Sequence, residues 1–338
     1  MENKVVETIK KYNMISENDK VIVAVSGGPD SMALLNALFN HKDELKISIF
    51  VAHVNHMIRA VADSETEYVK DFCANKGIEC FVKKANVLKI AKDEKISTEE
   101  AGRNVRYAFF EEVYEKVGAN KIAIAHNAND NAETVLMNII RGTGVSGLKG
   151  IEPVRDNKYI RPLIEIERAE IEQYCDDNKL DPKYDESNNE NTYTRNKIRN
   201  LLIPYIKKEF NPNIIDSINR LSDLASQENI YVEEVVDSYY KKIILEEHSK
   251  PDGEGIDLIK LDLKEFNKLD DFIKSRIVLL CVYKIFGSTK GIEKKHIKDI
   301  ITLCERNIGN KFLTPNKGLK VLVNKGEVSI FSLWKFCV

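Results

Sequence analysis

The sequence predicts an α/β fold, in which a doubly wound, mostly parallel sheet is followed by a mostly helical second domain. Two observations carry this prediction. Over the first two hundred residues, four short apolar runs alternate with segments of helical spacing, as in sheets whose helices cover both faces. From about Asn213 the strand-like runs give way to long stretches of helical periodicity. We therefore expect two domains, 1–212 and 213–338.

The four apolar runs, at residues 21–25, 47–54, 80–82 and 121–125, are expected to be parallel strands. They are apolar throughout rather than alternating, which is typical of strands buried on both faces. Ligands of such sheets bind beyond the carboxyl ends of the strands. The segments that follow three of the runs, 26–31, 53–59 and 126–133, should therefore lie on one edge of the sheet.

In the second domain we expect helices over 213–245, 272–286 and 294–304, and a hairpin over 319–331 around Asn324-Lys325-Gly326. The longest apolar run, seven residues at 277–283, is far shorter than the ~20 that a membrane span needs. The chain also begins without a signal-peptide pattern. We therefore expect no membrane association and a cytoplasmic location.

Charge and cysteine content argue against a protein that is basic overall and against a zinc-binding protein. With 51 Lys or Arg against 53 Asp or Glu, the net charge is −2, so the chain is not basic overall. A local basic face would still suffice for a nucleic-acid partner. The six cysteines form no CxxC pair and no zinc-like spacing, and we interpret them as buried thiols.

A glycine-rich loop follows the first apolar run and consists of Ser26, Gly27, Gly28, Pro29, Asp30 and Ser31. Its glycines let backbone N–H groups converge, and the next helix adds its positive N-terminal end. These features predict an anion site suited to pyrophosphate, with Asp30 holding Mg²⁺ or accepting a bond from the loop. A plain strand-to-helix turn is the competing interpretation. The loop lacks the lysine of a Walker motif, which is compatible with chemistry at an α-phosphate.

The Ser-Gly-Gly-x-Asp-Ser pattern resembles the loop of the N-type ATP pyrophosphatases, the PP-loop superfamily. Further motifs resemble, in the same order, those of the tRNA(Ile)-lysidine synthase family. They read AHVNHMIR from residue 52, EAGRNVRY from 100, RGTGVSGL from 141, RPL from 161, DESN from 185 and RNKIR from 195. The resemblance is strong over residues 15–210. Asn127 and Asn129 stand where the family usually has His and Asp, so no charged role is expected there.

The resemblance implies a reaction with ATP and Mg²⁺ that adenylates the 2-carbonyl of the wobble cytidine in the CAU anticodon of tRNA(Ile). The ε-amine of free L-lysine then attacks that ring carbon and gives lysidine, AMP and pyrophosphate. The expected partners are thus tRNA(Ile) and L-lysine, and a homodimer is left open. Another superfamily enzyme, a tRNA thiolase, is the first alternative, although the chain lacks the paired cysteines of 2-thiocytidine enzymes. A catalytically decayed RNA-binding protein is the second.

We expect Asp30, His126, Asp130 and Arg195 to be catalytic. Asp130 and Glu133 are three residues apart on an expected helix, so both side chains can face the same site. There the two carboxylates could bind lysine. Asp130 could also bind Mg²⁺ together with Asp30. The competing interpretation is a pair of first-turn acids that stabilise the helix dipole. His126 could likewise bond only a neighbouring backbone group.

Basic residues are expected to contact phosphate or tRNA because a guanidinium bonds two oxygens at once. Residues 191–208 contain five basic residues and no acidic one, and residues 284–325 contain ten against three. Solvated surface is the competing interpretation for all of them. The candidates are Arg103, Arg106, Arg195, Arg199, Lys294, Lys295 and Lys298.

Overall fold

The computed structural model describes residues 1–57, 62–183, 193–250, 255–315 and 318–333. Its contacts divide the chain into two units, Met1–Ser226 and Gln227–Val338. The division lies inside helix α11 (Ile214–Ile243), later than the boundary at 212/213 that we expected from the change in periodicity. In the part of the chain that the structure describes, no helix has both the length and the apolar content to cross a membrane.

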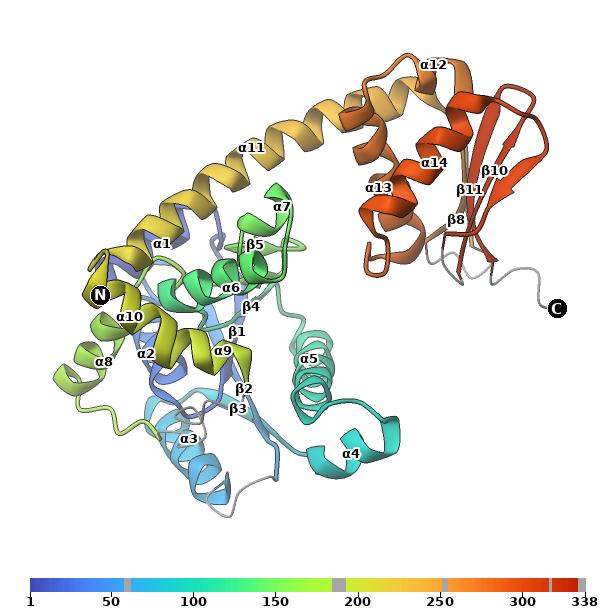
Figure 1. Ribbon diagram of the computed structural model, residues 1–338. Coiled ribbons are helices and arrows are strands. Elements are labelled where there is room, and N and C mark those ends of the chain that lie inside the picture. Colours follow the sequence, from blue (N-terminus) through green and yellow to red (C-terminus); the bar gives the residue numbers. More distant parts are fainter. Residues whose placement is uncertain (58–61, 184–192, 251–254, 316–317, 334–338) are drawn as a thin grey trace. The chain divides into compact units, whose positions relative to one another are not determined.

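The first unit contains a six-stranded sheet in the order β3-β2-β1-β4-β6-β5 (Figure 1). The strands are β1 (Lys20–Val25), β2 (Ser48–Asn55), β3 (Glu79–Lys84), β4 (Lys121–Ala123), β5 (Val154–Arg155) and β6 (Tyr159–Ile160). All pairs are parallel except β5 with β6. This arrangement confirms the expected doubly wound, mostly parallel sheet.

Helices cover both faces of this sheet because alternate residues of β1 point to opposite sides. One face of the sheet is covered by four helices: α1 (Glu2–Lys11), α2 (Pro29–Asn40), α3 (Ala62–Lys76) and α8 (Arg168–Asp177). Val21, Val23 and Val25 of β1 pack against these helices. The other face is covered by α5 (Thr98–Val117), which follows the short α4 (Val87–Glu94), and Ile22 of β1 packs on that side.

The remaining helices of the first unit gather around α6 (Ala128–Ile140), which follows β4 in the chain. They are α7 (Val145–Leu148), α9 (Thr194–Lys197), a π-helix η2 (Ile198–Leu202) and α10 (Ile203–Glu209), which lead into α11. Buried residues of α6 pack against Ile198 and Ile203 and against Ile215 of α11. A segment far along the chain is thereby fixed beside the first residues of α6.

The second unit has the expected helices α13 (Asp271–Phe286) and α14 (Lys294–Arg306), preceded by α12 (Leu263–Asn267). It also has a five-stranded antiparallel sheet, β7-β8-β11-β10-β9 (Figure 1). Its strands are β7 (Ile244–Ser249), β8 (Ile256–Asp262), β9 (Lys311–Leu313), β10 (Leu319–Asn324) and β11 (Glu327–Ser332). Only the β10–β11 hairpin was expected. The period-2 burial of Ile259 and Leu261 in β8 shows why a strand forms there.

Candidate active site

The loop Ser26–Ser31 connects β1 to α2 and is held by its own hydroxyl groups. Gly27 has φ +92°, a left-handed conformation that a side chain would strain. The backbone N–H of Ser26 donates to Ser31 Oγ at 3.1 Å, and Ser31 Oγ donates to the carbonyl of Gly28 at 2.9 Å. The carbonyl of Gly27 accepts from the N–H of Lys183 at 2.9 Å. The loop is thus pre-formed at the N-terminus of α2, as an anion site requires.

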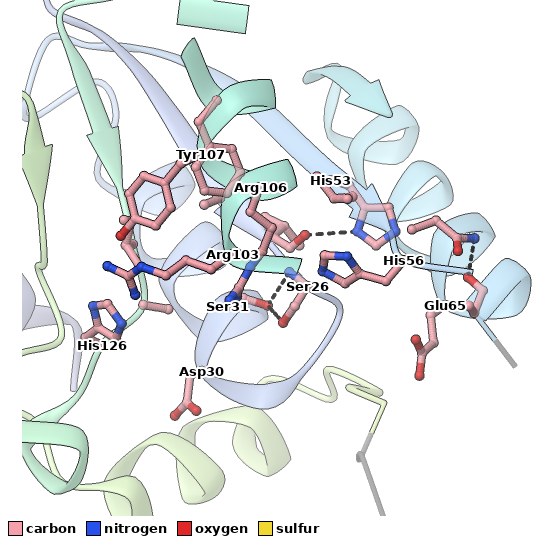
Figure 2. A pocket seen from close by; sticks show the side chains of 18 residues that line it. Ser26, Asp30, Ser31, His53, His56, Glu65, Arg103, Arg106, Tyr107 and His126 are labelled. Atoms are coloured by element: carbon pink, nitrogen blue, oxygen red, sulfur yellow. Dashed lines mark hydrogen bonds between the residues drawn. The ribbon is translucent and has the colours of Figure 1, made fainter. Parts of the chain in front are cut away.

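A cavity of about 560 Å³ opens beside this loop (Figure 2). The ends of β1, β2 and β4 and one side of α5 line it, which is where the alternation of strands and helices predicts a ligand site. The volume is ordinary for a site that holds a ligand of nucleotide size. Its polar lining includes Ser26, Asp30, Ser31, His53, Asn55, His56, Glu65, Arg103, Arg106, Tyr107 and His126.

Asn127 connects Asp30 to the start of α6. Its Nδ2 donates to Asp30 Oδ1 at 2.9 Å, and its Oδ1 accepts from the N–H of Asp130 at 2.9 Å. Asp130 Oδ2 in turn accepts from the N–H of Asn127 at 3.2 Å, which completes a capping box. The asparagine that departs from the family pattern therefore has a structural role that needs an amide and no charge.

The electrostatic environment of Asp30 disfavours its negative charge. Burial, followed by the nearby carboxylate of Asp130, raises the pKa of Asp30 from 3.8 to about 6. Arg168 and the hydrogen bond from Asn127 act in the opposite direction but do not cancel these effects. Within the described residues no group of three or more His, Cys, Asp or Glu side chains could hold a metal ion. Asp30 and Asp130 could therefore offer only two carboxylates to a cation.

Asp130 and Glu133 lie together, and the arginines at 195 and 199 reach them. Glu133, only 1% exposed, accepts from Arg195 Nε at 2.9 Å and from Arg199 Nε at 2.6 Å. The Nη2 atoms of both arginines donate to Asp130 Oδ1 at 3.1 Å, and Arg168 Nη2 lies 3.6 Å from the same oxygen. The two carboxylates that were expected to bind lysine are thus paired with the two arginines that were expected to contact phosphate or tRNA.

His126 follows β4 and contacts Arg161, which was not among the expected site residues. Arg161 Nε donates to His126 Nδ1 at 3.0 Å, and Arg161 is 4% exposed. Burial, and then the charges of Arg161 and Arg195, lower the pKa of His126 to about 3. The RPL motif was visible in the sequence, but nothing local to it indicated that its arginine faces this histidine.

Arg103 and Arg106 project from α5 and line the cavity, and Figure 2 shows Arg106 pointing toward Ser26 and Ser31. Arg103 stacks on Tyr107, 4.8 Å from the ring centroid. His53 has a structural position, since its Nδ1 lies 2.9 Å from the carbonyl of Val25 and its Nε2 lies 3.0 Å from Thr66 Oγ1. It joins the end of β1 to α3 behind the loop.

Some proposed residues belong to other parts of the chain. Lys294, Lys295 and Lys298 are in the second unit, where they are exposed on α14. Two motif segments, Arg59 and residues 185–188, lie outside the described residues. The described cysteines are all free thiols, and none of them lines the cavity.

Comparison with known proteins identifies similar chains. A family model described as a PP-loop domain matches residues 1–206. A tRNA(Ile)-lysidine synthase of Clostridium acetobutylicum is 49% identical over 331 residues, which are 98% of this chain and 70% of that protein. One from Clostridioides difficile is 42% identical over 327 residues, 96% of this chain and 69% of that protein.

Among solved structures, the U34-tRNA thiolase NcsA from Methanococcus maripaludis, solved with its 4Fe-4S cluster, has a TM-score of 0.56 and 22% identity. The match covers 67% of this chain and 78% of that one. At this identity the likeness shows the fold alone. It agrees with the doubly wound sheet of the first unit.

Proposed function

The chain belongs to the tRNA(Ile)-lysidine synthase family, and we propose that it ligates L-lysine to C2 of the wobble cytidine in the CAU anticodon of tRNA(Ile). The PP-loop domain indicates that ATP is used. The observation that carries the proposal is the pre-formed loop Ser26–Ser31 at a cavity of about 560 Å³ that Asp30, His126 and Arg106 also line. A cytoplasmic location, where tRNA is found, is part of the proposal, and a homodimer is left open.

The first step is adenylation of the cytidine. Its 2-oxygen attacks the α-phosphorus of ATP, the bond to the pyrophosphate oxygen breaks, and pyrophosphate leaves. The loop N–H groups and the serine hydroxyls would hold the phosphates, and Arg103 and Arg106 line the same cavity as positive charges. The protein's contribution to this step is therefore positioning and charge compensation.

Mg²⁺ fits beside Asp30. Magnesium in proteins is held by one or two carboxylates together with phosphate oxygens, and the carboxylate of Asp130 is close enough to disfavour the negative charge of Asp30. A cation there would relieve that repulsion. When bound, it would neutralise negative charge on the ATP phosphates.

In the second step the neutral ε-amine of lysine attacks C2, the C2–O bond breaks, AMP leaves and the amine loses a proton. Asp130 and Glu133 are the carboxylates proposed to attract the lysine ammonium groups. Because Arg195 and Arg199 already pair with them, lysine must compete with these arginines or use them for its own carboxylate. The mixed cluster offers both signs of charge, which suits a zwitterionic amino acid.

The decisive experiment is to incubate the protein with ATP, labelled lysine and an unmodified tRNA(Ile) transcript. We expect label in the RNA, and none when the wobble cytidine is replaced by uridine. Asp30→Ala and Ser26→Ala should each abolish ATP-dependent pyrophosphate release while the fold, followed by circular dichroism, is retained. Full activity of Asp30→Ala, or no transfer by the wild-type chain, would contradict the proposal.

A further inference from the structure

The contact between Arg161 and His126 determines which ring nitrogen of the histidine carries the proton. A guanidinium has only N–H donors and stays protonated in proteins. Arg161 Nε donates to His126 Nδ1 at 3.0 Å, so Nδ1 must present its lone pair. In the neutral ring the single proton is then on Nε2.

Arg161 is held so that it cannot turn away from this contact. Its Nη1 donates to the carbonyl of Glu152, and its backbone N–H donates to the carbonyl of Pro153 at 3.0 Å. The side chain is almost fully buried. The positive charges of four arginines also make a second proton on the His126 ring unfavourable: Arg103, Arg106, Arg161 and Arg195.

The other ring nitrogen is available to a ligand. His126 lines the cavity that holds the glycine-rich loop, and among the residues that the structure describes none accepts a hydrogen bond from its Nε2. A neutral histidine with this tautomer can donate through Nε2–H but has no free lone pair to accept a proton. With this geometry His126 cannot act as a general base.

We propose that His126 is a fixed hydrogen-bond donor, through Nε2–H, to a substrate oxygen that gains negative charge during adenylation, and that Arg161 is the positioning residue that fixes this tautomer. The donor role rests on the proposed function, whereas the tautomer does not. The oxygen is a non-bridging oxygen of the α-phosphate of ATP, because the 2-oxygen of the cytidine gives up electron density as it attacks phosphorus. A donor aimed at developing charge stabilises the transition state, as in an oxyanion hole.

The tautomer can be measured without an activity assay. In the full chain labelled with ¹⁵N-histidine, the His126 signals are identified by their loss in His126→Asn. We expect a neutral ring with the proton on Nε2 at pH 7, and a mixture of tautomers in Arg161→Met. Arg161→Lys keeps a donor and should keep the tautomer. A ring protonated on Nδ1, or a charged ring, in the wild-type protein would overturn the proposal.

Arg155→Met is the matched control for the loss of charge. Arg155 stacks on Tyr159 at 4.3 Å and makes no hydrogen bond to His126 among the described residues, yet its substitution removes the same charge from the same part of the unit. The tautomer should stay unchanged in this variant. If Arg155→Met and Arg161→Met alter the His126 signals equally, Arg161 has no specific role.

The donor role is tested by two substitutions that differ in reach. Glutamine can place an amide N–H near the position of Nε2, whereas asparagine reaches only as far as Nδ1. We expect kcat to fall about 10²–10³-fold in His126→Asn, the range for loss of one such donor, and clearly less in His126→Gln. Equal losses would overturn the donor role. Because the wild-type rate is measured first, failure of the proposed function is seen separately.

Sulfur substitution identifies the accepting oxygen, because sulfur is a weak acceptor. The ratio of wild-type to His126→Asn rates is measured with α-thio-ATP and, separately, with tRNA carrying 2-thiocytidine at the wobble position. The ratio should fall towards one with α-thio-ATP and stay near its usual value with 2-thiocytidine. If it does not fall with α-thio-ATP, His126 is not a donor to the α-phosphate.

Discussion

At the scale of single residues, the buried carboxylate of Asp30 lowers the free energy of unfolding at neutral pH. Its pKa in the folded protein, about 6, lies above the ordinary value of 3.8. Between these two values the folded protein holds a proton that the unfolded chain has released. The free energy of unfolding therefore falls as the pH rises through this window, and at neutral pH the ionised carboxylate costs stability.

Asp30→Asn should consequently stabilise the protein at pH 7 while inactivating it. The amide oxygen can still accept from Asn127, and the charge that burial and Asp130 disfavour is gone. We expect the free energy of unfolding to rise by up to ~3 kcal/mol at pH 7 and to be unchanged below pH 4. Urea denaturation at both pH values, with EDTA present, measures this. A destabilised variant at pH 7 would show that Asp30 is not strained by its environment.

Neighbouring positions on α6 should differ sharply in their effect on activity. Asp130 accepts from two arginines, whereas Asn129 uses its Oδ1 to cap α8 through the N–H of Arg168 at 3.0 Å. Asp130→Asn should lower kcat at least tenfold, since hydrogen bonds to charged groups contribute about 1.5–3 kcal/mol. Asn129→Ala should cost about 1 kcal/mol of stability and little activity. Equal losses of activity would mean that this helix start is only structural.

At the scale of elements, the π-helix and α9 are held to α6 by ion pairs as well as by the buried side chain of Ile198. Arg195 and Arg199 come from this segment, and Glu133 of α6 lies between them. Irregular π-turns are frequent at functional sites, where they re-aim side chains. Here the local geometry directs both arginines at the same carboxylate.

Replacing both arginines, Arg195→Met with Arg199→Met, leaves the charge of Glu133 buried without these partners. We expect a loss of roughly 3–5 kcal/mol in the free energy of unfolding, measured by urea denaturation. Adding Glu133→Gln to the same chain removes the buried charge and should restore most of the stability. If the triple variant were as unstable as the double, the arginines would act through packing and not through their charges.

The sequence predicted those elements whose pattern is local. The strands β1, β2 and β4 are continuous apolar runs, and the glycine-rich loop follows β1 directly. The strands β5 and β6 have only two residues each and no pattern to detect. In the second unit β7 is mostly exposed, so its sequence lacks the alternation that indicates a strand.

The site was predictable to a similar extent. The loop residues and the two carboxylates of α6 follow from motif and spacing, and the structure places them together. The pairing of Glu133 with Arg195, 62 positions apart, and of His126 with Arg161, 35 apart, depends on the fold. Composition and periodicity contain no information about such pairings.

At the scale of the whole molecule, a chain of net charge −2 needs local positive surfaces to bind an anionic RNA. Lys294, Lys295 and Lys298 are exposed on α14 and make no ion pair among the described residues. Five other lysines of the second unit do pair with acidic side chains among the described residues, as Lys241 does with Asp237 at 2.6 Å. The three lysines of α14 thus remain available for phosphates.

Neutralising Lys294, Lys295 and Lys298 to Gln should weaken tRNA binding and flatten its salt dependence. Each lost phosphate contact lowers the slope of log affinity against log salt by about 0.9 for a duplex or about 0.7 for single strands, so up to ~3 or ~2 in total. ATP binding should not change, because these residues lie in the other unit. Affinities measured over a salt series decide whether the slope changes.

The control neutralises three lysines of the same unit that already have acidic partners: Lys241, Lys260 and Lys268. The net charge changes equally, but the salt slope should stay close to that of the wild-type chain. If both triple variants have the same slope, overall charge matters and the α14 surface has no special role.

The double attachment of Asn127 has a consequence for how the gene can vary. The cap requires the amide oxygen to face Asp130, so the amide nitrogen necessarily faces Asp30. Aspartate is one nucleotide away in the code and nearly identical in shape, yet Asn127→Asp would exchange the donor for an oxygen 2.9 Å from a carboxylate. Like charges so close cannot both ionise, so the acid limb of the activity profile should move to higher pH. The smallest change in size at this position is thus among the largest in chemistry.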